Sequence, residues 1–152
     1  MEYTQEKCRK DTINHINEVR RCLSRVIVEL EERGRVHDKS KLESPEIEIF
    51  TEYTPKLASS TYGSTEYHEN LKGMQKALKH HYENNSHHPE HYKNGIQGMN
   101  LLDIIEMFCD WKAATLRHVD GDIRKSIEIN QKRFNYSDEL KEIFKNSVAI
   151  FD

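Results

Sequence analysis

The sequence predicts an all-α fold, a compact bundle of about six or seven helices. Three observations support this prediction. Apolar residues recur three and four positions apart through most of the 152 residues, as they do on one face of a helix. Residues typical of helix ends, such as Asn100 and Gly34, stand at the borders of these segments. No stretch of useful length alternates apolar and polar residues, so no strand is expected.

The expected helices follow one another along the chain. The first runs from about Asp11 to Arg33, and Gly34 is predicted to stop it. Ser44-Pro45-Glu46 is typical of a helix start, and Pro55 is expected to end or bend the short helix that follows.

The second half of the chain continues in the same way. After the small-residue loop LASSTYGST (57–65), an apolar stripe over residues 67–78 predicts another helix. Asn94-Gly95 indicates a turn, and Asn100 is suited to cap the most apolar helix, which we expect to be buried nearly all round and to reach residue 118. Asp120-Gly121-Asp122 separates it from a helix over 122–134, and Ser137 begins the last helix.

Composition and charge limit the kind of protein. The chain is long enough to enclose one core, so we expect a single domain over residues 1–152. Its formal charge of −3, with both signs mixed, argues against long nucleic acid or a membrane surface as a partner. No apolar run is long enough to span a membrane, and no export leader is expected. Three scattered cysteines without a C-x-x-C pair favour a reducing, cytoplasmic location.

Several polar side chains fall on apolar helix faces. His15 lies on the apolar face of the first helix. His81 continues the stripe of residues 67–78, whereas His80 points to the opposite side. The helix after Asn100 carries four charged residues along one edge: Asp103, Glu106, Asp110 and Arg117. Buried carboxylates are costly unless they are paired or bound to a cation, so these positions are candidates for a site.

Each candidate also has a plainer explanation. A lone histidine in a core can be satisfied by one hydrogen bond. Asp103 stands about three residues beyond the helix start, where an acid commonly serves the amides of the first turn. Asp110 has no such reason in mid-helix, so its alternative is a buried ion pair with Arg117 or a lysine. Glu106, one turn earlier, is suited to orient a ligand or a water molecule.

The adjacent pair His37-Asp38, followed closely by Lys41, adds the donor types of a metal site. Imidazole nitrogen and carboxylate oxygen together suit Mn²⁺, Fe²⁺, Co²⁺, Ni²⁺ or Zn²⁺, and a carboxylate can bridge two such ions. Histidines and aspartates from separate helices that meet in one interior would form this site. We therefore expect a divalent metal as cofactor, one or two ions, with Mg²⁺ also open.

Taken in order, His15, His37-Asp38 and Asp110 resemble the H…HD…D signature of the HD-domain superfamily of metal-dependent phosphohydrolases, which has an all-helical core. HDKSK resembles the H-D-x-G-K form of phosphodiesterase-type members, with Ser40 where glycine is usual and the lysine kept as Lys41. CDWKAA resembles the A-D-x-x-x-A segment that carries the final aspartate ligand in nucleotidase-type members. This resemblance favours Asp110 over Asp103 as a ligand.

The run HHYENNSHHPEH (80–91) holds five of the nine histidines. It resembles the extra histidines that hold a second metal in phosphodiesterase and HD-GYP-type members. The resemblance implies His81 and one of His87 and His88 as ligands, with Asp38 as the bridge. The Gly-Tyr-Pro triplet is missing, so specificity for a cyclic dinucleotide does not carry over. From about residue 15 to 134 the chain also resembles a small HD-like family of bacteria and their phages.

The resemblance implies a metal-dependent phosphohydrolase in which metal-activated water attacks phosphorus. The implied substrate is a small phosphoester, most naturally a nucleotide: a nucleoside monophosphate, a nucleoside triphosphate or a cyclic nucleotide. Asp38, Lys41 and Glu106 are expected to serve catalysis. The predicted phosphate contacts are Lys41, Arg117 and Arg133, and the predicted metal ligands are His15, His37, Asp38, His81, His87, His88 and Asp110.

A non-catalytic role is the alternative hypothesis. In that case the ions would hold the helices of a binding protein together, and the protein would sequester a nucleotide or block a partner. Surface or paired charge is the alternative for Lys41, Arg117 and Arg133, and a solvated helix end is the expectation for His80 and His91. The sequence leaves the oligomeric state open, a homo-oligomer included.

Overall fold

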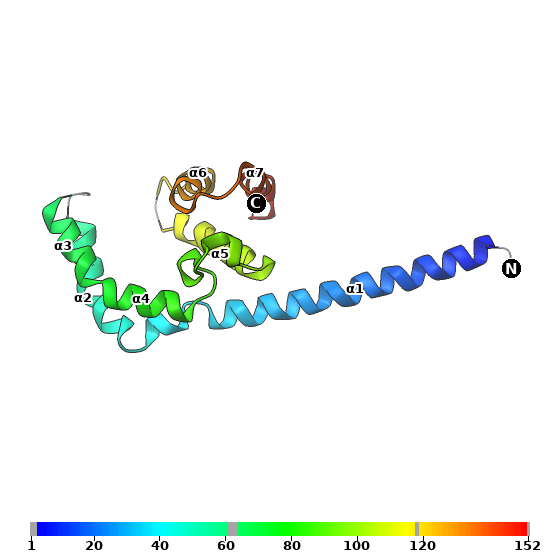
Figure 1. Ribbon diagram of the computed structural model, residues 1–152, viewed down its shortest axis with the longest axis horizontal. Coiled ribbons are helices and arrows are strands. Elements are labelled where there is room, and N and C mark those ends of the chain that lie inside the picture. Colours follow the sequence, from blue (N-terminus) through cyan, green and yellow to red (C-terminus); the bar gives the residue numbers. More distant parts are fainter. Residues whose placement is uncertain (1–2, 61–63, 118, 152) are drawn as a thin grey trace. The chain divides into compact units, whose positions relative to one another are not determined.

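A computed structural model describes residues 3–60, 64–117 and 119–151 of the chain (Figure 1). In these residues every regular element is helical, and seven α-helices are joined by turns and four short 3₁₀ helices. The predicted all-α class and the predicted number of helices are therefore confirmed. Of the predicted small-residue loop, residues 61–63 lie outside the described part of the chain.

The chain divides into two compact units, Met1–Val36 and His37–Asp152. The first unit consists of helix α1 (Gln5–Val36), which is longer at both ends than the sequence predicts. Gly34 does not stop this helix but lies inside it, and the left-handed residue that follows the helix is Asp38. Within this unit α1 has no buried residue, and most of its apolar side chains are exposed there. A single domain over residues 1–152 stays a prediction.

The second unit begins with three helices: α2 (Glu46–Ser59), α3 (Thr65–Gly73) and α4 (Gln75–Asn84). Helix α2 packs against both α3 and α4. The predicted start of α2 at Ser44-Pro45-Glu46 is confirmed to within one residue, but α2 continues beyond Pro55 to Ser59. The apolar stripe of residues 67–78 belongs to two helices, because α3 ends at Gly73. A side chain at Gly73 would collide with the ring of Tyr53 on α2.

Helix α5 (Leu101–Thr115) begins as the sequence predicts. The side chain of Asn100 accepts hydrogen bonds from the amides of Leu102 and Asp103, and the carboxylate of Asp103 accepts one from the amide of Asn100. The prediction that α5 is buried nearly all round is wrong, since Leu101 is 77% exposed and Ile105 is 40% exposed. Helix α5 also ends at Thr115, three residues earlier than predicted. The apolar content of α5 therefore overstates its burial.

Helices α6 (Ile123–Phe134) and α7 (Asp138–Ser147) complete the second unit. Asp122 and Ser137 cap their first turns through side-chain oxygens, so the predicted start of α7 is confirmed and that of α6 to within a residue. The hydrophobic core lies among α5, α6 and α7, which are yellow to red in Figure 1, and consists of Met107, Phe108, Ile123, Ile127, Tyr136, Phe144 and Val148. Helix α5 contributes Met107 and Phe108 to this core.

No helix in the described part of the chain is long and apolar enough to cross a membrane. All three cysteines are free thiols.

Candidate metal centre

His37 and Asp38 lie in the turn that directly follows α1, at the start of the second unit. Asp38 has a φ of 54°, in the left-handed region, and the amide of Lys41 donates to its carbonyl at 2.9 Å. The 3₁₀ helix Lys39–Leu42 continues from there. Both side chains are mostly covered, at 27% exposure for His37 and 20% for Asp38. This turn therefore directs an imidazole and a carboxylate into the second unit.

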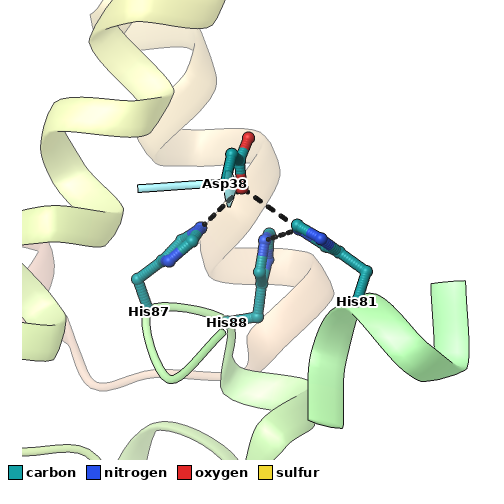
Figure 2. Close-up of side chains that lie close together, drawn as sticks. All are labelled: Asp38, His81, His87 and His88. Atoms are coloured by element: carbon teal, nitrogen blue, oxygen red, sulfur yellow. Dashed lines mark hydrogen bonds and ion pairs between the residues drawn. The ribbon is translucent and has the colours of Figure 1, made fainter. Parts of the chain in front are cut away.

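Three further histidines face Asp38 (Figure 2). His81 lies on α4, and its side chain is 2% exposed. His87 and His88 lie in the loop after α4, directly before the short 3₁₀ helix Pro89–His91. His87 is buried to the same extent as His81, and His88 is partly buried. The sequence left open which of His87 and His88 is a ligand, and the structure brings both to the cluster.

The Nε2 atoms of His81 and His87 converge on one carboxylate oxygen. Oδ1 of Asp38 lies 3.3 Å from Nε2 of His81 and 3.5 Å from Nε2 of His87. The Nε2 atoms of His81 and His88 are 2.9 Å apart. Two atoms of this group, Oδ1 of Asp38 and Nε2 of His87, are buried without any hydrogen-bond partner among the described residues. Buried polar atoms without a partner are rare and call for an explanation.

The separations fit a metal ion. Zinc ligands at about 2.0–2.1 Å from the ion lie roughly 3.3 Å from one another when the coordination is tetrahedral. The two distances from Asp38 to the histidines match that value. One ligand atom from each of Asp38, His81, His87 and His88 forms a group in which all atoms lie within 4.8 Å of one another. Three imidazole nitrogens and one carboxylate oxygen are a donor set that Zn²⁺ and other transition metals accept.

A second group adjoins the first and consists of His37, His87 and Asp110. Asp110 is on α5, and its Oδ1 atom lies 3.7 Å from Nε2 of His37. The same nitrogen is 3.6 Å from Oδ2 of Asp38. The two oxygens of Asp38 therefore face different groups, an arrangement that allows this carboxylate to bridge two ions. Among the described residues Asp110 pairs with His37 and forms no ion pair with Arg117.

Glu106, one turn before Asp110 on α5, contacts the Nδ1 atoms of two of the imidazoles. Its Oε1 atom accepts a hydrogen bond from Nδ1 of His37 at 2.8 Å and lies 3.1 Å from Nδ1 of His87. Metal-binding histidines usually donate their second ring nitrogen to such an acceptor, which fixes the orientation of the ring. This contact agrees with an orienting role for Glu106.

The electrostatics of the cluster favour charged aspartates. Burial raises the pKa of Asp38, but the nearby His81 and the hydrogen bond from Lys41 outweigh this effect and hold the pKa far below its ordinary value. Burial likewise raises the pKa of Asp110, yet His37 brings it below its ordinary value. Contacts with Asp110 and Glu106 raise the pKa of His37 to about 10, against the opposing effect of burial, so a metal ion at this group would have to displace a proton from His37.

His88 has the opposite shift. Burial, together with the neighbouring His87 and His81, lowers the pKa of His88 to about 3. A neutral imidazole keeps a lone pair on one ring nitrogen, and this lone pair is what a metal ion requires. His88 is therefore kept neutral, which is the protonation state in which an imidazole can bind a metal ion.

The loop that carries His87 and His88 is fastened to α5 by Asp103, which is fully buried. Its carboxylate accepts hydrogen bonds from Ser86 Oγ at 2.8 Å and Tyr92 Oη at 2.7 Å, in addition to the amide of Asn100 at 2.9 Å. The capping role expected for Asp103 is thus confirmed. The contacts with Ser86 and Tyr92 go beyond that expectation, and they fix both ends of the histidine loop.

Not every predicted site residue joins the cluster. His15 lies on α1 in the first unit, where its side chain is exposed, and its role as a ligand stays a prediction from the sequence. Arg133 pairs with Glu90 at 2.6 Å, and Arg117 is exposed just beyond the end of α5. Lys41 does reach the cluster, because its Nζ atom lies 2.6 Å from Oδ2 of Asp38.

Sequence reasoning missed Glu46, the first residue of α2. This carboxylate is fully buried and accepts hydrogen bonds from Nδ1 of His80 at 2.7 Å and of His81 at 2.9 Å. Burial raises its pKa, but contacts with His80, Ser40 and His81 bring the pKa below its ordinary value. An acid after Ser-Pro in a first helical turn normally serves the helix dipole. No pattern in the sequence therefore distinguishes Glu46.

Fold and site together define an all-α protein with a buried cluster of histidines and aspartates suited to hold a metal ion. Over residues 4–150 the chain matches the family described as "Family of unknown function (DUF5662)", and it belongs to that family. No curated protein and no solved structure matches the chain.

Proposed function

We propose that this protein is an HD-type metal-dependent phosphohydrolase that acts on a small phosphoester. One observation carries the proposal. Oδ1 of Asp38 and Nε2 of His87 are buried, face each other and have no hydrogen-bond partner among the described residues, while Nε2 of His81 and His88 lie beside them. A divalent cation satisfies all four atoms at once.

The residues that would hold the metal fall into two sets. Asp38, His81, His87 and His88 form the first, and His37, His87 and Asp110 form the other, with the second oxygen of Asp38 facing His37. A further contribution from His15 rests on the sequence pattern. When bound, a divalent ion lowers the pKa of water toward neutrality and offsets negative charge on a phosphoryl oxygen.

Differences in exposure suggest where a substrate approaches. His81 and His87 are 2% exposed, whereas the side chains of His37 and Asp110 are 27% and 31% exposed. Lys41 is 41% exposed and bonds the oxygen of Asp38 that faces His37. A phosphate at this open edge can exchange places with Asp38 as a partner of the Lys41 ammonium. Lys41 would thus neutralise charge on the phosphoryl group, and Glu106 would keep His37 in its orientation.

The proposed substrate is a small phosphorylated molecule, most naturally a nucleotide. Lys41 is the cationic side chain with a contact to the cluster in the described part of the chain, since Arg133 is occupied by Glu90. With so few cations, the site suits one phosphoryl group better than a long polyanion. Free thiols at Cys8, Cys22 and Cys109 fit the cytoplasmic location that we propose.

One observation favours a second candidate function. Asp38, His81, His87 and His88 provide four ligand atoms, which is a complete set for a tetrahedral structural zinc. The protein would then be a metal-stabilised binding protein that sequesters a nucleotide or blocks a partner. The more exposed group of His37 and Asp110 favours the enzyme, because a structural site has no use for it.

The test begins with elemental analysis of the purified protein. The protein is then incubated with Mn²⁺ and a panel that includes a nucleoside monophosphate, a nucleoside triphosphate and a cyclic nucleotide. Release of phosphate, pyrophosphate or nucleoside is measured. We expect turnover of at least one substrate, its loss after treatment with a chelator, and its return when metal is added back.

Two outcomes would count against the enzyme. Bound metal without turnover on any member of the panel would favour the binding protein. A protein that takes up no divalent metal, including Zn²⁺ and Mn²⁺ added in excess, would remove both candidates.

A further inference from the structure

Glu46 is an acid without any exposed surface, although it lies at the first position of a helix. A buried carboxylate is costly unless hydrogen bonds replace its water. Here two imidazoles do so. Oε1 accepts from Nδ1 of His80 at 2.7 Å, and Oε2 accepts from Nδ1 of His81 at 2.9 Å. Both oxygens of Glu46 are therefore directed at histidine rings, of which only that of His81 belongs to the cluster around Asp38.

The hydrogen-bond pattern places a proton on Nδ1 of His81. Nδ2 of Asn85 lies 3.1 Å from this nitrogen and could in principle donate to it. The two hydrogens of that amide are already directed elsewhere, one to Oγ of Ser40 at 2.7 Å and the other to the carbonyl of His81 at 2.8 Å. Oγ of Ser40 also lies near this nitrogen, at 3.3 Å, but Ser40 contacts the Glu46 carboxylate as well. An ionised Glu46 can only accept, so Nδ1 of His81, at 2.9 Å, donates to it.

The opposite ring nitrogen of His81 is the one that faces the cluster. Its Nε2 atom lies 3.3 Å from Oδ1 of Asp38 and 2.9 Å from Nε2 of His88. A neutral imidazole with its proton on Nδ1 has its lone pair on Nε2, which is the form that binds a metal. A ring with the proton on Nε2 would point a hydrogen at the place where the ion belongs.

We propose that Glu46 is a positioning residue of the metal site, which holds His81 with its proton on Nδ1 and its lone pair on Nε2 directed at the ion. The inference rests on the proposed metal site and adds to it a residue that touches neither metal nor substrate. His80 contacts the other oxygen of Glu46 and helps to satisfy that buried carboxylate, but its ring does not face the ion.

The first experiment measures metal affinity in Glu46→Gln, in which the amide keeps the size of the side chain but can turn its NH₂ group toward His81. Competition with a chromophoric chelator for Zn²⁺ should show binding about 10–100-fold weaker than in the wild type. The matched control is Glu48→Gln. Glu48 is exposed in the same first turn of α2, and its replacement changes the charge near the helix end equally. We expect wild-type affinity in this control.

The second experiment uses the metal-free wild type and does not depend on the folding of a variant. Two-bond ¹H–¹⁵N correlation spectra of the histidine-labelled protein report which ring nitrogen carries the proton, and His81→Gln assigns the signals. We expect a proton on Nδ1 of His81. A bare Nδ1 would overturn the inference.

The two proposals fail separately. If the wild type binds no metal, the proposed function falls. If the wild type binds metal and a folded Glu46→Gln variant binds it equally well, the metal site stands and the positioning role of Glu46 is overturned.

Discussion

Oδ1 of Asp38 and Nε2 of His87 lie 3.5 Å apart in the interior, and neither atom has a hydrogen-bond partner in the described part of the chain. Asp38 also faces His37 through its other oxygen, at 3.6 Å. The carboxylate therefore stands between the two groups of ligands. Its removal tests both groups at once.

We expect Asp38→Ala to lose bound metal and phosphohydrolase activity together, because this variant removes the carboxylate whose two oxygens face the two groups. Metal content measured by elemental analysis and turnover of the best panel substrate would check this. Asp38→Asn should fold and yet retain little metal, since asparagine tolerates the left-handed backbone but lacks the charge. Wild-type metal content in either variant would refute the assignment of Asp38.

Adjacent histidines on α4 provide an internal comparison. His81→Ala should lose most of the bound metal, because Nε2 of His81 faces both Asp38 and His88. His80→Ala should keep nearly wild-type activity, since His80 is partly exposed and contacts Glu46 rather than the cluster. Metal stoichiometry and activity would be measured for both variants. The reverse pattern would show that the roles of the two positions are exchanged.

Asp103 should matter for stability more than for chemistry. Asp103→Ala leaves the hydroxyls of Ser86 and Tyr92 and the amide of Asn100 without their acceptor. We expect a loss of about 2–4 kcal/mol in the free energy of unfolding, measured by chemical denaturation. Tyr92→Phe removes one of these bonds and should cost about 1–2 kcal/mol. If Asp103→Ala has the same midpoint of chemical denaturation as the wild type, Asp103 does not stabilise the histidine loop.

Tyr136 should stabilise the folded protein by an amount that decreases at alkaline pH. Its hydroxyl donates to the carbonyl of Ile127 at 2.6 Å, and burial, then Glu128, raises its pKa to about 12. The pKa of tyrosine in an unfolded chain is about 10. The contribution of Tyr136 to the free energy of unfolding is therefore complete below pH 10 and is lost as the pH rises toward 12. Tyr136→Phe should cost about 1 kcal/mol at neutral pH.

The difference between wild type and Tyr136→Phe should shrink when the free energy of unfolding is measured at pH 11 instead of pH 9. Other tyrosines and the lysines titrate in both proteins, so their effects cancel in the comparison. A constant difference across this range would contradict the raised pKa of Tyr136.

The sequence predicted the starts of helices well where a capping residue was present. Asn100 and Ser137 cap α5 and α7 as expected, because their side-chain oxygens reach amides only two or three residues away. Gly34 misled, since glycine permits a helix end without requiring one. Burial of α5 was overestimated, because apolar content alone does not say which faces find a neighbour.

The candidate site was predicted where helical periodicity applied and was missed where it did not. Helical phase distinguished His81 from His80, and the structure shows His81 buried and His80 partly exposed. The choice between His87 and His88 had no such basis, because both lie in a loop without a period. Glu46 could not be found from its neighbours in sequence, since its partners are 34 and 35 residues away.

The backbone at Asp38 implies a trade between stability and chemistry. A residue other than glycine at a φ of 54° costs roughly 1–2 kcal/mol, and the charge of Asp38 also repels that of Asp110. Glycine at this position would relieve the backbone penalty, but it would also remove the contacts with Lys41 and His81 that hold the pKa of Asp38 far below its ordinary value and so stabilise the folded chain. The left-handed turn therefore keeps a carboxylate where the backbone alone favours glycine, and Asp38→Gly should give a protein that is no more stable and that has lost the central ligand.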